Sequence, residues 1–354
     1  MKILVRAPNW VGDAVMAIPA LETIRRARVD DEIVVLARPA VTDLFSGQLF
    51  ADRILPYDFG GKHAGWLGRE TLAAELRREK FDVAVLLQNA FEAAWLAWRA
   101  DIPERIGYAR DARGPLLTNA IPVPQDGESP KHESHYYLEL LRRAGWCETS
   151  PVIPPIRLSV TEAARSAAES ALRNAGAREN SRRVAIAPGA SYGAAKCWPP
   201  ERFAHVADRL ISESGADVLF FGTPAEKEIA ARIRSNMKSS AIFLVGETSM
   251  RDLAALFACC SFFIGNDSGA MHVAAAAGLP VIGIFGPTDP ESTAPVTDEV
   301  TLIREGVSCS PCFLRRCPVD HRCMERISTD SVFAAAMQLK NSRKNLSVRG
   351  AKNA

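Results

Sequence analysis

Long apolar runs are missing from this sequence, and so is a large excess of charge. No stretch approaches the ~20 apolar residues that a membrane-spanning helix needs, and the apolar start, Ile3 to Val5, is too short for a signal peptide. The 354 residues carry a formal net charge of +2, too small for a protein that wraps nucleic acid. We therefore expect a cytoplasmic globular protein whose eight cysteines are mostly reduced.

Two nucleotide-binding signatures are also absent. No G-x-G-x-x-G follows the strand expected at the start of either half of the chain, and no G-x-x-x-x-G-K-[ST] occurs anywhere. Both motifs hold phosphates on a glycine-rich turn that leads into a helix. Their absence argues against an ordinary dinucleotide enzyme and against a P-loop NTPase.

The chain does contain one plan twice: a strand, a glycine-bearing turn and a helix. In the first half we expect strands at residues 2–6, 33–37 and 83–87 and helices at 14–28 and 70–80. In the second half we expect strands at 183–187, 218–221, 262–264 and 281–285. Strands that alternate with helices indicate a parallel sheet covered on both faces. The sequence therefore predicts an α/β protein with two Rossmann-like, doubly wound domains facing a cleft.

Proline-rich segments suggest where the domains meet. Residues 151–155 contain three prolines, and we place the boundary there, with a first domain at 1–155 and a second at 156–330. Residues 341–354 form a basic tail without acids, which we expect to be loose. Such a tail is also suited to touch an anionic membrane, at roughly 1 kcal/mol per cation.

One carboxylate follows the first strand directly. In open α/β sheets, ligands bind beyond the carboxyl ends of the strands, and Asp13 lies in the first such turn. It is placed to act as a general base on a substrate hydroxyl. The alternative is a structural acid in the first turn of a helix, where it contributes ~0.3–1 kcal/mol.

The segment from Gly265 to His272 is the corresponding turn of the second half. Asp267 and Ser268 occupy the place of a helix N-cap, and Gly269 permits close approach of a ligand. Free N–H groups at such a helix start attract phosphate. We expect this turn to hold a nucleotide-linked substrate, with simple helix capping as the alternative.

Three further side chains suit the same ligand. Lys196, ahead of a helix, would neutralise a diphosphate, or it is a solvated lysine. Glu226 would accept hydrogen bonds from a ribose, or it is a first-turn helix acid. His272 would contact phosphate, although a lone histidine is more often structural.

Four cysteines fall within fifteen residues near the end of the second half: Cys309, Cys312, Cys317 and Cys323. Cys309 and Cys312 have metal-ligand spacing, and the other two would complete a tetrahedral structural site for zinc or iron. Because the second pair is not C-x-x-C, free or redox-active thiols remain the alternative.

Five motifs in order resemble one family. They are Trp10–Met16, Pro188–Ala190, Lys196–Pro199, Asn266–His272 and Phe285–Thr288. The chain resembles the ADP-heptose:lipopolysaccharide heptosyltransferases of glycosyltransferase family 9 from residue 1 to about residue 330, and its motifs look most like those of the heptosyltransferase II branch.

The resemblance implies a GT-B fold, with the acceptor bound by the first domain and the ADP-sugar by the second. It also implies a terminal helix at residues 331–340 that crosses back onto the first domain. The implied reaction is an inverting transfer of heptose from ADP-heptose to a lipid A-linked core acceptor at the inner membrane surface. No cofactor is required, and the cysteine cluster departs from the best-known members.

Site residues carry over by position. Asp13 matches the proposed catalytic base, Lys196 the holder of the donor phosphates and Glu226 the ribose-binding acid. The resemblance assigns the rest of the donor site to Ser191, Asp267, Ser268, Gly269 and His272, and acceptor contacts to Lys62, Arg110 and Arg113. Open alternatives are heptosyltransferase I or another family 9 sugar transferase, a sugar-nucleotide epimerase, and a non-catalytic nucleotide-binding protein.

Overall fold

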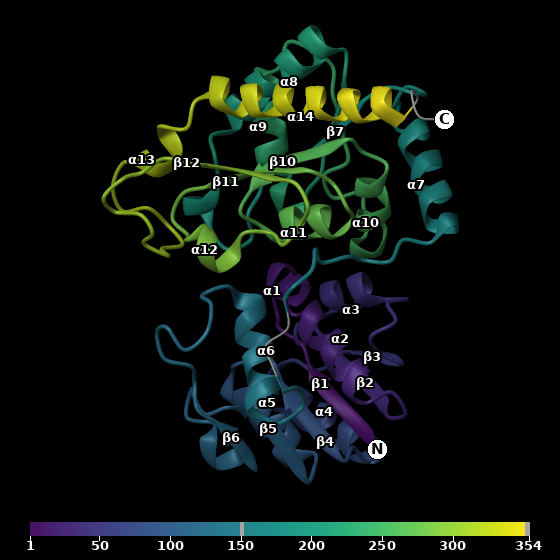
Figure 1. Ribbon diagram of the computed structural model, residues 1–354, viewed down its shortest axis with the longest axis vertical. Helices are drawn as coiled ribbons and strands as arrows, with labels where there is room; N and C mark the ends of the chain where they lie inside the picture. The colour runs from purple at the N-terminus through teal and green to yellow at the C-terminus, as the bar shows by residue number, and fades with distance from the viewer. Residues whose placement is uncertain (149–151, 351–354) are drawn as a thin grey trace. The chain divides into compact units, whose positions relative to one another are not determined.

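The computed structural model describes the backbone of residues 1–148 and 152–350 and the side chains of residues 1–148 and 152–339. The chain forms two compact units, one from Met1 to Ile156 and one from Arg157 onward. Each unit is built on its own six-stranded parallel sheet (Figure 1).

The sheet of the first unit has the strand order β3-β2-β1-β4-β5-β6. Its strands are β1 (Lys2–Arg6), β2 (Glu32–Ala37), β3 (Arg53–Pro56), β4 (Val83–Leu86), β5 (Glu104–Tyr108) and β6 (Asn119–Ile121). The α-helices are α1 (Val11–Met16), α2 (Ile18–Ala27), α3 (Pro39–Phe45), α4 (Gly65–Glu79), α5 (Phe91–Arg99) and α6 (Glu133–Arg143). The order reverses between β1 and β4, which is where an α/β sheet opens a crevice for a ligand.

The second unit repeats this order as β9-β8-β7-β10-β11-β12. Its strands are β7 (Arg183–Ala187), β8 (Asp217–Phe220), β9 (Ile242–Phe243), β10 (Phe262–Asn266), β11 (Val281–Phe285) and β12 (Val300–Arg304). Its α-helices are α7 (Glu162–Asn174), α8 (Pro200–Ser214), α9 (Lys227–Asn236), α10 (Met250–Ala258), α11 (Gly269–Ala276), α12 (Pro290–Thr293), α13 (Arg322–Glu325) and α14 (Thr329–Gly350). The switch point lies between β7 and β10.

The predicted α/β class with two parallel sheets is confirmed. The single helix expected at residues 14–28 is wrong, because α1 ends at Met16 and α2 begins at Ile18. Pro19 lies at the start of α2, and a proline has no N–H to continue a helical hydrogen-bond ladder. The short strands β3 and β6, of four and three residues, were not predicted.

The C-terminal helix α14 packs in the second unit. Val332, Phe333 and Leu339 join the core that contains Phe203 of α8. The crossing of residues 331–340 back onto the first domain stays a prediction. Helix α14 runs along α8 (Figure 1). The helical backbone continues to Gly350, and the side chains of the basic tail at 341–354 lie outside those described.

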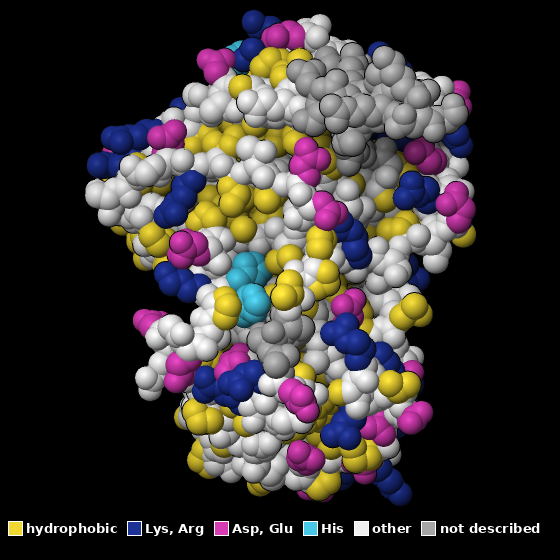
Figure 2. Space-filling view, viewed as in Figure 1, with side chains coloured by type: hydrophobic (Ala, Val, Ile, Leu, Met, Phe, Trp, Pro, Cys, Tyr) yellow, Lys and Arg dark blue, Asp and Glu magenta, His cyan; other side chains and the backbone are white. Residues whose placement is uncertain are grey.

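In the part of the chain that the structure describes, no helix is long and apolar enough to cross a membrane. Figure 2 shows basic and acidic side chains interspersed over the visible face of each unit. This mixture agrees with the small net charge of +2.

Candidate functional site

The side chains predicted for the second unit gather at one edge of its sheet. Ser191 and Lys196 follow β7, Glu226 follows β8, and Asp267 and Ser268 follow β10. Strand β7 pairs in parallel with both β8 and β10, so these turns leave the sheet at the same edge. The candidate donor site therefore lies at the switch point, where ligands bind in this fold.

A buried ion pair lies at its centre. Lys196 Nζ is 2.5 Å from Asp267 Oδ2, and the two side chains are only 12% and 4% exposed. Thr288 Oγ1 donates a second hydrogen bond to the same oxygen, at 2.6 Å. The ammonium also lies 4.8 Å from the centre of the Tyr192 ring. Asp267 thus fixes the direction of the Lys196 side chain. The alternative of a solvated lysine does not hold, because Lys196 is buried and paired.

Asn266 joins the turns after β7 and β10. Its Nδ2 donates to Pro188 O at 2.7 Å, and its Oδ1 accepts from Trp198 N at 3.0 Å. The side chain is fully buried. Asn266 and Thr288 belong to the motifs that carry the family resemblance, but no individual role was predicted for either. Both act through their neighbours, by holding Asp267 and the turn that carries Lys196.

Helix α11 begins without a side-chain cap, contrary to the expectation that Asp267 or Ser268 would provide one. Ser268 is the N-cap residue but makes no capping hydrogen bond. Its Oγ is buried and has no hydrogen-bond partner among the described residues. The first N–H groups of a helix have no partner within the helix. Ser268 Oγ and the helix start, which includes Gly269, are therefore available to an anion. His272 is buried one turn further on.

Glu226 lies against two glycines. Thr223 N donates to its Oε2 at 2.7 Å, within a capping box at the short 3-10 helix Pro224–Glu226. A Cβ at Gly189 would lie 1.9 Å from Glu226 Oε1, and one at Gly222 would lie 2.8 Å from Oε2. Both turns need glycine because the carboxylate occupies the space of a side chain. One oxygen of Glu226 caps a helix, and the other faces the turn after β7.

The cysteine-bearing loop encloses the turn that carries Lys196. Ala195 N donates to Arg315 O at 3.1 Å, and His321 Nε2 lies 2.7 Å from Ala195 O. Tyr192 OH donates to Phe313 O at 2.5 Å. The loop thus contacts both the N–H and the C=O of Ala195, next to Lys196. The spacing of the cysteines in the sequence did not predict this role.

The cysteines themselves are free thiols: Cys309, Cys312, Cys317 and Cys323. Burial raises the pKa of the Cys323 thiol, and the charges of Cys309, Cys317 and Cys312 raise it further, so each of the three acts electrostatically on Cys323. Across residues 1–148 and 152–339, no three cysteine, histidine or acidic side chains are arranged to hold a metal ion.

In the first unit, Asp13 lies in the first turn of α1, directly after β1. Helix α1 contacts α6, whose first residue is Glu133. Burial raises the pKa of Glu133 to about 7; the charge of Asp13 raises it too, and Arg110 opposes the shift. Burial, followed by the charges of Asp13 and Glu133, also raises the pKa of Tyr137. Asp13 therefore lies near Glu133 and Tyr137, and its charge raises the pKa of both groups. Glu133 was not predicted.

The three basic residues expected to contact the acceptor differ in their surroundings. Arg113 is fully buried and donates to Tyr108 O, Asn89 Oδ1 and Gln88 O, so it holds the loop instead of facing solvent. Arg110 is exposed, with Tyr136 OH 3.4 Å from its Nη1. Lys62 is exposed and pairs with Glu75 at 2.5 Å. The structure does not bring the three together by any contact among the described side chains.

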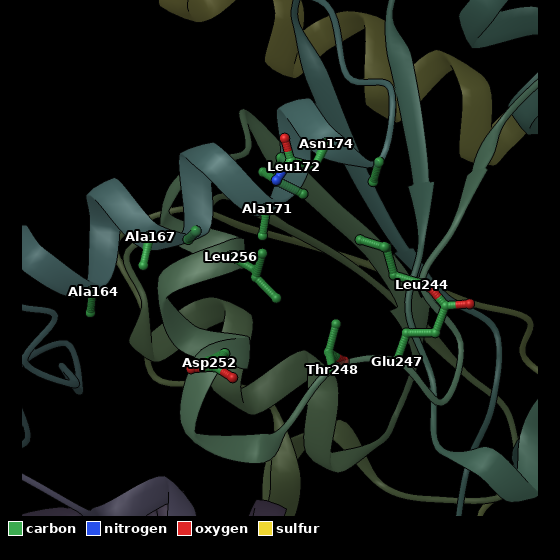
Figure 3. Close-up of a pocket in the computed structure, with 12 residues that line it drawn as sticks. Ala164, Ala167, Ala171, Leu172, Asn174, Leu244, Glu247, Thr248, Asp252 and Leu256 are labelled. Carbon is green, nitrogen blue, oxygen red and sulfur yellow. The ribbon is translucent and has the colours of Figure 1, made fainter.

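A cavity of about 590 Å³ lies elsewhere in the second unit (Figure 3). It is bordered by alanines of α7, such as Ala167 and Ala171, and by Leu256 of α10. None of the predicted donor residues lines it. The polar switch-point edge, and not this apolar hollow, is therefore the candidate site.

The comparisons with known proteins agree with this arrangement. The model of the family "Glycosyltransferase family 9 (heptosyltransferase)" matches residues 69–322. Lipopolysaccharide heptosyltransferase 2 of Salmonella typhimurium is 32% identical over 312 residues, which cover 86% of this chain and 88% of the relative. The structure of E. coli ADP-heptose lps heptosyltransferase II aligns with a TM-score of 0.81 and 27% identity, over 97% of this chain and 100% of that one. A family 9 glycosyltransferase of Veillonella parvula shares the fold, with a TM-score of 0.84 and 24% identity over 96% of each chain. The chain therefore belongs to glycosyltransferase family 9 and is a glycosyltransferase.

Proposed function

We propose that the protein transfers L-glycero-D-manno-heptose from ADP-heptose to the inner heptose of the lipopolysaccharide core, heptosyl-Kdo2-lipid A, with inversion at the anomeric carbon. Relatives that carry the name heptosyltransferase 2 support the assignment over most of the chain. The observation that carries it is the buried pair of Lys196 and Asp267 beside the uncapped start of α11. This arrangement fits a diphosphate that leaves from a sugar.

The donor site stabilises the leaving group. Lys196 supplies a fixed positive charge, and Ser268 Oγ and the first N–H groups of α11 supply donors to phosphate oxygens. Glu226 accepts from the ribose, and Ser191, Gly269 and His272 line the same edge. Donors and charges arranged in advance are worth most where negative charge develops.

Asp13 acts as the general base in the first unit. It removes the proton from the acceptor hydroxyl, and that oxygen attacks the anomeric carbon opposite the ADP group. The diphosphate spreads its charge over several oxygens and leaves without a proton donor. One catalytic carboxylate is then sufficient, whereas glycoside hydrolysis uses two.

A transfer assay tests the proposal. Purified protein is given ADP-heptose and acceptors that carry or lack the inner heptose, and products are identified by mass. A gain of one heptose only on the acceptor that has the inner heptose is the expected result. Transfer to the acceptor without it indicates heptosyltransferase I activity. Consumption of ADP-heptose without acceptor indicates an epimerase.

The four clustered cysteines are proposed as ligands of one structural metal ion, zinc or iron. The support is the Cys309–Cys312 spacing and the electrostatic effect of the other three cysteines on Cys323. Binding requires the thiols to draw closer than they are. The metal would brace the loop around Ala195 and so hold Lys196 in place. Two measurements test the metal site: the metal content of the purified protein, and the melting temperatures of wild type and Cys312→Ser with and without a chelator. The metal site is refuted if the purified protein contains no metal and its melting temperature does not change in chelator.

We also place the protein at the cytoplasmic face of the inner membrane, because the proposed acceptor is anchored there by lipid A. Basic residues beyond 340 supply charge for that contact. Co-sedimentation with anionic vesicles, with and without residues 341–354, measures it.

A further inference from the structure

Three charged side chains at the carboxyl edge of the first sheet have no role in the proposed transfer. Arg6 ends β1, Arg38 follows β2, and Glu92 lies in the first turn of α5, after β4. Strand β1 pairs in parallel with β2 and β4. The three side chains therefore come together at the edge that also carries Asp13.

Two aromatic rings form a floor beneath the arginines. Arg6 Cζ lies 5.3 Å from the centre of the Tyr57 ring, and Arg38 Cζ lies 3.8 Å from the centre of the Phe59 ring. The two ring centres are 6.4 Å apart. Each guanidinium group thus lies within cation–π distance of one of two neighbouring rings.

Each arginine keeps an unused donor. Arg6 is 3% exposed and donates to Ala7 O and Asn9 Oδ1, both at 2.6 Å. Its Nε is buried with no hydrogen-bond partner among the described residues, and the same is true of Arg38 Nε. A buried donor left unpaired is unfavourable, and a ligand atom that accepts its hydrogen bond removes that cost. Two such donors on adjacent guanidinium groups indicate a site for an acceptor-only ligand.

The charges at this edge do not balance. Glu92 interacts electrostatically with both arginines, but its Oε1 has no hydrogen-bond partner among the described residues, and its ion pair with Arg69 Nε is long, at 3.4 Å. Burial, with the charge of Arg38 adding to it, lowers the pKa of Arg6 to about 10. A second negative charge beside the arginines would favour their charged form and raise the pKa of Arg6 toward its usual value.

We propose that Arg6 and Arg38 bind an anionic group of the acceptor, a carboxylate or a phosphate, above the floor of Tyr57 and Phe59. The identity of the acceptor rests on the proposed function. Trp10 and Phe91 stand 45% and 48% exposed at the same sheet edge and offer apolar faces to sugar rings. An anion held there orients the acceptor relative to Asp13, which follows the same strand as Arg6.

Direct binding of a deacylated acceptor oligosaccharide, without donor, tests the site. Arg38→Gln is the informative variant because Arg38 is only half-buried, so its loss leaves the core intact. Arg28→Gln is a matched control, since Arg28 is also half-buried and lies 4.8 Å from an aromatic ring, that of Trp146. We expect Arg38→Gln to weaken binding at least about tenfold and Arg28→Gln to leave it unchanged. Equal affinity of Arg38→Gln and wild type would overturn the proposal.

The same oligosaccharide without its phosphates identifies the group. If Arg38→Gln weakens binding of both forms, the anion is a sugar carboxylate. If it weakens binding of the phosphorylated form alone, the anion is a phosphate.

A second measurement is independent of the acceptor and of turnover. Phenylglyoxal labels arginine side chains, and peptide mass analysis reports labelling of Arg38 and Arg28 separately. We expect inorganic phosphate or acetate to slow labelling of Arg38 and not of Arg28. If the wild-type protein binds no oligosaccharide, the proposed function fails, but the labelling experiment still tests the anion site. The anion site is refuted if neither phosphate nor acetate slows the labelling of Arg38.

Discussion

The two sheets share one strand order but differ at their carboxyl edges. In the second unit the central charges are paired, with Lys196, Asp267 and Thr288 joined at 2.5 and 2.6 Å. In the first unit they are not: Arg6 and Arg38 keep unused donors, and Glu133 has a pKa of about 7. In the same architecture, the charges at the edge of the second sheet are paired, whereas the arginines at the edge of the first sheet lack a full set of partners.

The difference follows from what each edge has to do in the proposed reaction. A leaving diphosphate needs a cation and donors fixed before charge develops. A base needs an environment that favours proton uptake, and an acceptor that carries anions needs unpaired cations. The paired edge is therefore suited to the donor, and the unpaired edge to the acceptor and the base.

The largest expected effect is that of Asp13→Asn. Removal of a general base costs about 10²–10⁴ in rate, so heptose transfer should fall by that factor. Binding of ADP should stay within about twofold, because the donor residues lie in the other unit. Single-turnover transfer and calorimetric ADP titration measure the two quantities. Near-normal turnover would remove Asp13 from the mechanism.

Lys196→Met should act on the donor alone. A hydrogen bond to a charged group is worth about 1.5–3 kcal/mol, so the KM for ADP-heptose should rise roughly 10- to 150-fold. The KM for the acceptor should not change. Thr288→Val is the control, since it removes one hydrogen bond to Asp267 without removing a charge and leaves the ammonium in place. Equal donor KM values for Lys196→Met and Thr288→Val would contradict the paired edge as the diphosphate site.

Gly189→Ala should displace Glu226, because the new Cβ would lie 1.9 Å from its Oε1. Overpacking of this kind costs about 1–3 kcal/mol, and donor affinity should fall by up to about a hundredfold if Glu226 binds the ribose. Gly306→Ala is the matched control, as a Cβ there meets nothing within 4 Å. A variant that loses stability but keeps wild-type ADP affinity would leave Glu226 a purely structural residue.

The sequence was informative where chemistry is local. The strands at 2–6 and 183–187 were predicted, because buried apolar runs mark them. The residues proposed for the donor site, from Lys196 to His272, were found from the glycine-bearing turns that carry them, and their donor roles stay a prediction. The partners of those residues were not predicted. Thr288 reaches Asp267, and Arg315 reaches Ala195, across 21 and 120 positions of chain. Such contacts depend on strand order and loop path. For the same reason Arg113 was predicted to face a ligand, although its guanidinium is used by Tyr108 O and Asn89 Oδ1.

Glu133→Gln should give the smallest effect and the one most specific to the first unit. The folded pKa of Glu133 is raised from 4.5 to about 7, so its carboxyl group stabilises the fold fully below pH 4.5, and this stability is lost as the pH rises through 7. Glutamine imitates the protonated form. The variant should therefore match wild type at pH 4.5 and exceed it by about 1–2 kcal/mol at pH 8, after a discount for partial exposure.

Urea unfolding of the first unit at several pH values measures that difference. Glu128→Gln is the control, because Arg143 lowers the pKa of Glu128, and its substitution should lower stability at pH 8. In an Asp13→Asn background the gain from Glu133→Gln should shrink, since the charge of Asp13 contributes to the shift. An unchanged gain would mean that burial alone raises the pKa of Glu133, and that the charge of Asp13 does not act on this carboxyl group.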